Sequence, residues 1–143
     1  MQEKRMQNFN NLTMFIDKFQ NIEYGKLIID DKNDGSPEHP RQMPYIKYHD
    51  LVYEFISAIC DFQNNHTEFN LINYKEILHS QLIEWNSTSI EGVVVDDLNA
   101  ETVLALLIGI LRLERFCEGT LLSMLENGVI QRCLMRLKEI DND

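Results

Sequence analysis

Apolar residues recur at steps of three and four near the start of the chain, which is the spacing of one helix face. We therefore expect a helix within residues 1–20, with its apolar face formed by Phe9, Leu12, Phe15, Ile16 and Phe19. The pattern then changes at residues 22–30, where β-branched and aromatic residues predict a strand with Gly25 as a candidate bulge. Residues 43–48 are also short and aromatic, so we expect them to pair back onto that strand.

Turn-forming residues separate these two strand segments. Residues 31–42 contain Gly, Pro, Asn and Asp in close succession, which predicts a loop. Beyond the second strand, a helix is expected over residues 50–63 with Asp50 at its start, and a weaker helix over residues 73–86. Residues 87–97 are expected to be a linker that contains a short strand at 93–95.

The last third of the chain has the clearest helix signals. Asn99 is a strong N-cap, and the helix after it is apolar on nearly every side through Leu111, so we expect it to be the central buried helix. A shorter helix is predicted from Gly119 to Asn127–Gly128, and an amphipathic helix after it.

Together these elements predict an α+β fold, mostly helical, in one domain spanning residues 1–143 with a small two-stranded β-hairpin. Its parts are an N-terminal helix (1–20), the hairpin with its loop (22–48), two helices (49–86) and a C-terminal helical core (98–140). A chain of 143 residues is long enough to bury such a core.

Charge changes this picture mainly by excluding partners. The net charge is −10, and residues 51–100 carry eight acidic residues against one basic residue. Nucleic-acid binding needs a concentrated basic surface, so general nucleic-acid binding is not expected.

The longest apolar run has nine residues, against the roughly 20 of a membrane-spanning helix. No signal peptide is evident at the N-terminus, so we expect a cytoplasmic protein that does not bind membranes.

Cysteine and histidine spacing gives no metal or cofactor site. Cys60, Cys117 and Cys133 are widely separated and each lies in an apolar helical pattern, so we expect reduced, buried thiols. The four histidines lack metal-ligand spacing. Cys117 lies beside two arginines, which lower a thiol pKa, but no histidine near it in the sequence is available as a base.

Two segments carry the candidate functional residues. The first is the loop at 31–42, in which Asp34, Glu38 and His39 lie close together; glutamate and histidine are suited to acid, base or ligand roles. A solvated turn explains the same residues. A calcium loop is excluded because Lys32 and Arg41 occupy ligand positions.

The second segment is the predicted helix junction that contains Arg112, Arg115 and Glu118. Helix dipoles explain all three charges, in which case each arginine should bond Glu114, Glu118 or a carbonyl at the junction. The alternative is a small anion site beside the helix that begins at Gly119.

Two stretches of the sequence together resemble a bacterial family of domains of unknown function, number 6508 in that series. The matching residues are Gly25–Asp30, Asn33–Pro40, Gln42–Pro44, Val103–Leu106, Arg112, Arg115–Gly119, Leu134, Leu137, Lys138 and Ile140. The resemblance implies a small stand-alone bacterial protein, in some cases encoded near mobile elements. It implies no activity, cofactor or site.

Two classes of function therefore remain. The first is a binding or regulatory protein that recognises a protein partner through the 31–42 loop or the acidic middle of the chain. The second is an enzyme that acts on a small anionic substrate through Glu38, His39, Arg112 and Arg115. We favour the first, because no set of nucleophile, base and orienting group can be assembled from the sequence. The sequence does not determine the oligomeric state or any catalytic residue.

Overall fold

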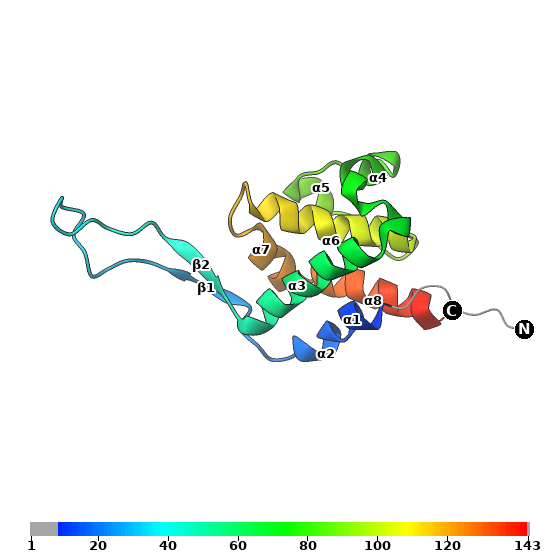
Figure 1. Ribbon diagram of the computed structural model, residues 1–143, viewed down its shortest axis with the longest axis horizontal. Helices are drawn as coiled ribbons and strands as arrows, with labels where there is room; N and C mark the ends of the chain where they lie inside the picture. Colours follow the sequence, from blue (N-terminus) through cyan, green and yellow to red (C-terminus); the bar gives the residue numbers. More distant parts are fainter. Residues whose placement is uncertain (1–8, 143) are drawn as a thin grey trace, which may run out of the picture.

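A helical body and a long β-hairpin that projects from it make up the molecule in the computed structural model, which describes residues 9–142 (Figure 1). The strands are β1 (Gly25–Ile28) and β2 (Tyr45–Tyr48). The helices are α1 (Asn10–Thr13), α2 (Phe15–Lys18), α3 (Asp50–Asn65), α4 (Tyr74–Ser80), α5 (Ser87–Glu91), α6 (Ala100–Glu114), α7 (Thr120–Glu126) and α8 (Val129–Asn142), with 3-10 turns at Thr67–Phe69 and Leu71–Asn73. The expected mostly helical α+β class is confirmed.

Helix α6 forms the centre of the body. It contacts α3, α4, α7 and α8, and every residue from Thr102 to Ile110 is buried. The predicted cap is present, because the Asn99 side chain accepts a hydrogen bond from the Thr102 N–H at 2.9 Å. Gly109 lets the indole of Trp85 approach closely, and the Trp85 Nε1–H donates to the Gly109 carbonyl at 2.9 Å.

The N-terminal helix differs from the prediction because it is interrupted. Helices α1 and α2 are separate four-residue turns that meet at Met14. Phe9, Leu12 and Phe15 are nevertheless buried, as the apolar pattern predicts. In a regular α-helix with 3.6 residues per turn, side chains spaced three apart would drift around the helix surface. The break between α1 and α2 keeps these side chains on the same side. The part of the prediction at residues 1–8 lies outside the described residues.

The segment between α3 and α6 also departs from the prediction. The expected helix over residues 73–86 ends at Ser80, where Leu82 turns to a φ of +62° and is 91% exposed. The expected linker at 87–97 contains helix α5, because the Asn86 side chain caps it by accepting from the Ser89 N–H at 2.8 Å. Residues 93–95 form no strand.

The hairpin pairs as the sequence predicts. β1 and β2 are antiparallel, with Gly25 opposite Tyr48 and Ile28 opposite Tyr45. Gly25 is a regular paired residue, so the expected bulge is wrong. A Cβ there would lie 3.1 Å from the Lys47 carbonyl oxygen, so the close approach of β2 explains the glycine.

The C-terminal helices begin and end at the predicted signals. Gly119, with a φ of +102°, precedes α7, and Gly128, with a φ of +90°, separates α7 from α8. Across residues 9–142, no helix has the length and apolar character that crossing a membrane requires.

Candidate functional site

The hairpin extends well beyond its paired strands, and we call residues 29–44, between β1 and β2, the distal arm. Figure 1 shows that the distal arm points away from the helical body. It contains all of the predicted loop at 31–42, which therefore does not fold over the helix junction that contains Arg112 and Arg115.

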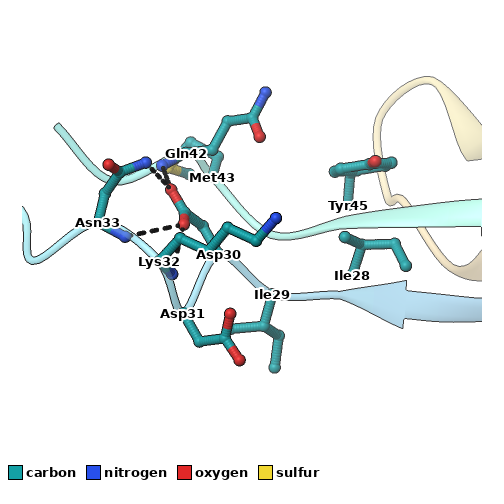
Figure 2. A pocket seen from close by; sticks show the side chains of 9 residues that line it. All are labelled: Ile28, Ile29, Asp30, Asp31, Lys32, Asn33, Gln42, Met43 and Tyr45. Atoms are coloured by element: carbon teal, nitrogen blue, oxygen red, sulfur yellow. Dashed lines mark hydrogen bonds between the residues drawn. The ribbon is translucent and has the colours of Figure 1, made fainter. Parts of the chain in front are cut away.

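Asp30 organises the neck of the distal arm. Its carboxylate accepts hydrogen bonds from the N–H groups of Lys32 and Asn33 at 3.0 and 3.2 Å and from the Asn33 side-chain amide at 3.0 Å. The Gln42 N–H, on the returning chain, donates to the same carboxylate at 2.7 Å (Figure 2). These bonds hold the pKa of Asp30 well below its usual value, and the bond from the Gln42 N–H lowers the pKa most. One carboxylate thus joins the outgoing and the returning segment of the arm.

The tip of the distal arm is a second ordered turn. The Asp34 carboxylate accepts from the Ser36 N–H at 2.9 Å, and this bond lowers the pKa of Asp34. The Gly35 and His39 backbones close the turn, with the Gly35 N–H donating to the His39 carbonyl at 3.0 Å. Asp34 is therefore a structural residue of the turn.

Glu38 and His39 differ from Asp34, because their side chains are exposed and take no part in the turn. In the described part of the chain, neither side chain has a hydrogen-bond partner. These two predicted residues are neighbours in the sequence, and both side chains are exposed at the tip.

Large apolar side chains lie exposed on the distal arm and on the adjoining ends of β1 and β2. Leu27 is 54% exposed, Ile29 60%, Met43 81% and Tyr45 42%. A shallow cavity of about 250 Å³ lies between the two chains of the arm, as Figure 2 shows. Its lining residues are Ile28, Ile29, Asp30, Asp31, Lys32, Asn33, Gln42, Met43 and Tyr45.

The helix junction binds the base of the hairpin. The Glu118 carboxylate accepts from the Ile46 N–H at 2.9 Å, and the Glu114 carboxylate accepts from the Tyr48 hydroxyl at 2.7 Å. Glu114 also accepts from the N–H groups of Gly119 and Leu121, at 3.1 and 2.9 Å, and so caps the start of α7. Burial, together with this bond to Glu114, raises the pKa of Tyr48.

The two arginines make other contacts than those expected. Arg112 donates from Nη2 to the Gln63 Oε1 at 3.3 Å, which joins α6 to α3. Arg115 is exposed, and within residues 9–142 its side chain makes no hydrogen bond; only its backbone N–H does, to the Arg112 carbonyl at 3.2 Å. The expectation that each arginine bonds Glu114, Glu118 or a carbonyl at the junction is therefore wrong. Glu114 and Glu118 are occupied by backbone N–H groups and the Tyr48 hydroxyl instead.

Both arginines border a small cavity of about 100 Å³ between α3, α6 and α7. Its other lining residues are mostly apolar, and they are Ile56, Cys60, Gln63, Ile108, Leu111, Glu114 and Leu121. Glu38 and His39 are absent from this lining. The arrangement therefore does not assemble the acid, base and anion-binding groups that the enzyme hypothesis requires.

The cysteines correct another expectation. Cys133 is buried as predicted, and burial raises the pKa of its thiol to about 12. Cys60 and Cys117 are exposed, because Cys60 lies at the solvent side of α3 and Cys117 in the turn after α6. All three are free thiols. The structure groups no three His, Cys, Asp or Glu side chains of residues 9–142 as a metal site.

Sequence reasoning missed the roles of Asp30, Glu114 and Tyr48. Asp30 had a usable signal, since aspartate followed by turn residues commonly accepts bonds from the backbone two residues on. The pairing of Glu114 with Tyr48 had none, because 66 positions separate them.

Comparison with known proteins gives a family and no activity. A family described as "Family of unknown function (DUF6508)" matches residues 4–143. Neither a curated protein nor a solved structure matches the chain.

Proposed function

The chain belongs to the DUF6508 family, whose function is unknown, and we propose that it is a protein-binding module whose recognition element is the distal arm. The observation that carries this proposal is the exposure of Ile29 and Met43 on an ordered backbone. Exposed apolar side chains grouped on one feature are typical of a protein interaction site.

Order in the arm supports the proposal. The Asp30 carboxylate joins the outgoing and returning chains, and the turn at Asp34 closes the tip. An arm that is already ordered loses less conformational entropy when it binds, so more of the contact energy contributes to affinity.

The exposed groups indicate how a partner is recognised. Ile29 and Met43 flank the neck cavity and offer an apolar contact, while Glu38 and His39 lie at the tip. An apolar centre surrounded by polar groups is the usual arrangement of a protein interface.

The enzyme hypothesis receives less support. It requires Glu38 and His39 to act with Arg112 and Arg115, but the first pair lies at the tip of the arm and the second on the helical body (Figure 1). Neither Glu38 nor His39 lines the cavity beside Arg112 and Arg115.

We also propose a cytoplasmic location. Cys60 and Cys117 are exposed, unpaired thiols, which persist in a reducing compartment and oxidise in secreted proteins.

A photo-crosslinking amino acid placed at His39 tests the proposal in cells of the source organism. The same crosslinker at Leu82, which is 91% exposed on the body, is the matched control. We expect one protein to be crosslinked from position 39 and not from position 82. Met43→Ser should reduce that crosslink at least severalfold, whereas Met135→Ser, at a 56% exposed position of α8, should leave it unchanged.

Crosslinking that is equal from positions 39 and 82, or unaffected by Met43→Ser, would contradict the proposal. A purified partner identified in this way provides the second measurement. Its dissociation constant should rise by about tenfold or more for Met43→Ser, because truncating a buried interface anchor costs at least about 1–2 kcal/mol.

A further inference from the structure

The two strands of the hairpin differ in how their outer edges are protected. In an antiparallel pair, residues alternate between those that bond across the pair and those whose N–H and C=O point outward. The His49 N–H donates to the Tyr24 carbonyl, which places Lys26 and Ile28 in the bonded set. The N–H and C=O groups of Leu27 therefore point away from β2. Those of Ile29 also point away from β2 if the alternation continues past the end of β1.

The outer edge of β2 is blocked. Ile46 lies opposite Leu27 and has the same outward geometry, and its N–H is bonded to Glu118. Pro44, the residue before β2, has no N–H to offer. A further strand therefore cannot bond along β2.

The outer edge of β1 has no such protection. Within residues 9–142, neither the Leu27 N–H nor the Ile29 N–H donates a hydrogen bond to a group outside the hairpin. Both side chains are more than half exposed. Proteins usually block such an edge with proline, a bulge or a covering element, because an open edge pairs readily with another strand.

We infer that the outer edge of β1 pairs antiparallel with the same edge of a second copy of this chain, with Ile28 opposite Ile28. This pairing joins two hairpins into a four-stranded sheet. Leu27 of each copy then lies opposite Ile29 of the other, so the most exposed apolar side chains of the edge cover one another. The inference goes beyond the proposed function. The two proposals share Ile29, but Met43, Glu38 and His39 lie outside the segment at residues 26–30 that pairs.

Charge selects this register. Pairing centred on Ile28 places Lys26 opposite Asp30 at both ends of the paired segment. Moving the centre by one residue toward the N-terminus places Glu23 opposite Asp31, and moving it one residue toward the C-terminus places Lys26 opposite Lys32. Like charges directly opposite each other destabilise a sheet, and opposite charges stabilise it.

The shape of the molecule permits the pairing. The hairpin projects from the body (Figure 1), so two antiparallel hairpins place the two bodies at opposite ends of the new sheet. Each chain has a net charge of −10, and this separation reduces the repulsion between the bodies.

Sedimentation velocity over a range of protein concentrations tests the inference. We expect a concentration-dependent dimer in the natural protein. Leu27→Pro should abolish it, because proline removes an outward N–H while the bonds between β1 and β2 remain. Leu27→Ala keeps the N–H and should weaken the dimer severalfold without abolishing it. Circular dichroism melts establish that each variant is folded.

A disulfide crosslink tests the register independently of proline. In a Cys60→Ser, Cys117→Ser background, Ile28→Cys should form a disulfide-linked dimer under mild oxidation, because directly opposite Cβ atoms lie at about 4.5–5.5 Å, close to disulfide range. Lys26→Cys is the matched control, since it lies opposite Asp30 and should crosslink much more slowly.

A monomer at all concentrations, a dimer that survives Leu27→Pro, or equal crosslinking from positions 26 and 28 would each overturn the inference. The photo-crosslinking from His39 is a separate experiment, so failure of the dimer leaves the result for the proposed function distinguishable.

Discussion

Leu107 has no exposed surface and lies at the middle of α6. Leu107→Ala should lower the free energy of unfolding by about 2–5 kcal/mol, because it removes buried methyl groups and leaves a cavity. Chemical denaturation measures the change. Met135→Ala, at a 56% exposed position of α8, is the control and should change stability by no more than about 0.5 kcal/mol. Similar values for the two variants would show that α6 is not the core.

The cysteines give a second prediction for single residues. Cys60 and Cys117 are exposed, whereas Cys133 is fully buried and has a pKa of about 12. A thiol reagent at neutral pH should therefore label two cysteines of the native protein and reach the third only after denaturation. Mass spectrometry of the labelled peptides identifies them, and rapid native labelling of Cys133 would contradict the burial.

Glu114 connects three elements through one side chain. Glu114→Ala should destabilise the protein by about 1–3 kcal/mol, because the Gly119 and Leu121 N–H groups and the Tyr48 hydroxyl lose their acceptor. Tyr48→Phe removes one of these bonds and should cost about 0.5–1.5 kcal/mol. In the double variant the two losses should be less than additive, and strict additivity would show that the two groups do not interact.

The neck of the distal arm should depend on pH. The bonds to the Asp30 carboxylate lower its pKa in the folded protein, so protonation opposes the folded neck. The neck is then fully stabilised above the unfolded-state pKa of roughly 3.9, and this contribution is lost as the pH falls below that value toward the lowered folded-state pKa. The chemical shift of the Gln42 amide, followed by NMR, measures this. Asp30→Ala should give the acid-state shift already at neutral pH.

Elements whose ends carry strong local signals could be predicted from the sequence, and elements whose ends lack such signals could not. Asn99, Gly119 and Gly128 act within one helix turn of themselves, and the helix ends they predict are present. Leu82, in contrast, belongs to an apolar helical pattern and yet ends it with a positive φ. The N–H groups of Leu82 and Ile83 end the helix there by donating to the carbonyls of His79 and Leu78, at 2.9 and 3.0 Å. Glycine usually occupies that left-handed position, so a leucine gave no signal of a helix end.

The candidate site shows the same division. The loop at 31–42 follows from turn residues alone, and the structure places its ordered turns there. The contacts of Arg112 and Glu118 depend on Gln63 and Ile46, which come from other elements. No spacing rule predicts such pairs, because the relative position of the elements is set by the packed core.

For the molecule as a whole, the distal arm and the body should be separable. Replacing residues 31–42 by Asn-Gly connects Asp30 to Met43, which lie opposite each other if the register of β1 and β2 continues. The melting temperature should stay within a few degrees of that of the natural protein, because the removed residues contribute nothing to the buried core. A large fall in melting temperature would show that the arm stabilises the body.

The bonds from Glu114 and Glu118 to the hairpin affect the order in which the molecule acquires its parts. The two strands are close in sequence, separated by residues 29–44, whereas the bonds that direct the hairpin join residues 66 and 72 positions apart. Contacts between residues distant in sequence tend to form later in folding than contacts between near ones. The arm therefore takes its final direction only after α6 and α7 have packed. If the arm binds a partner as proposed, a partner that requires this direction would bind the fully folded chain in preference to a partly folded one.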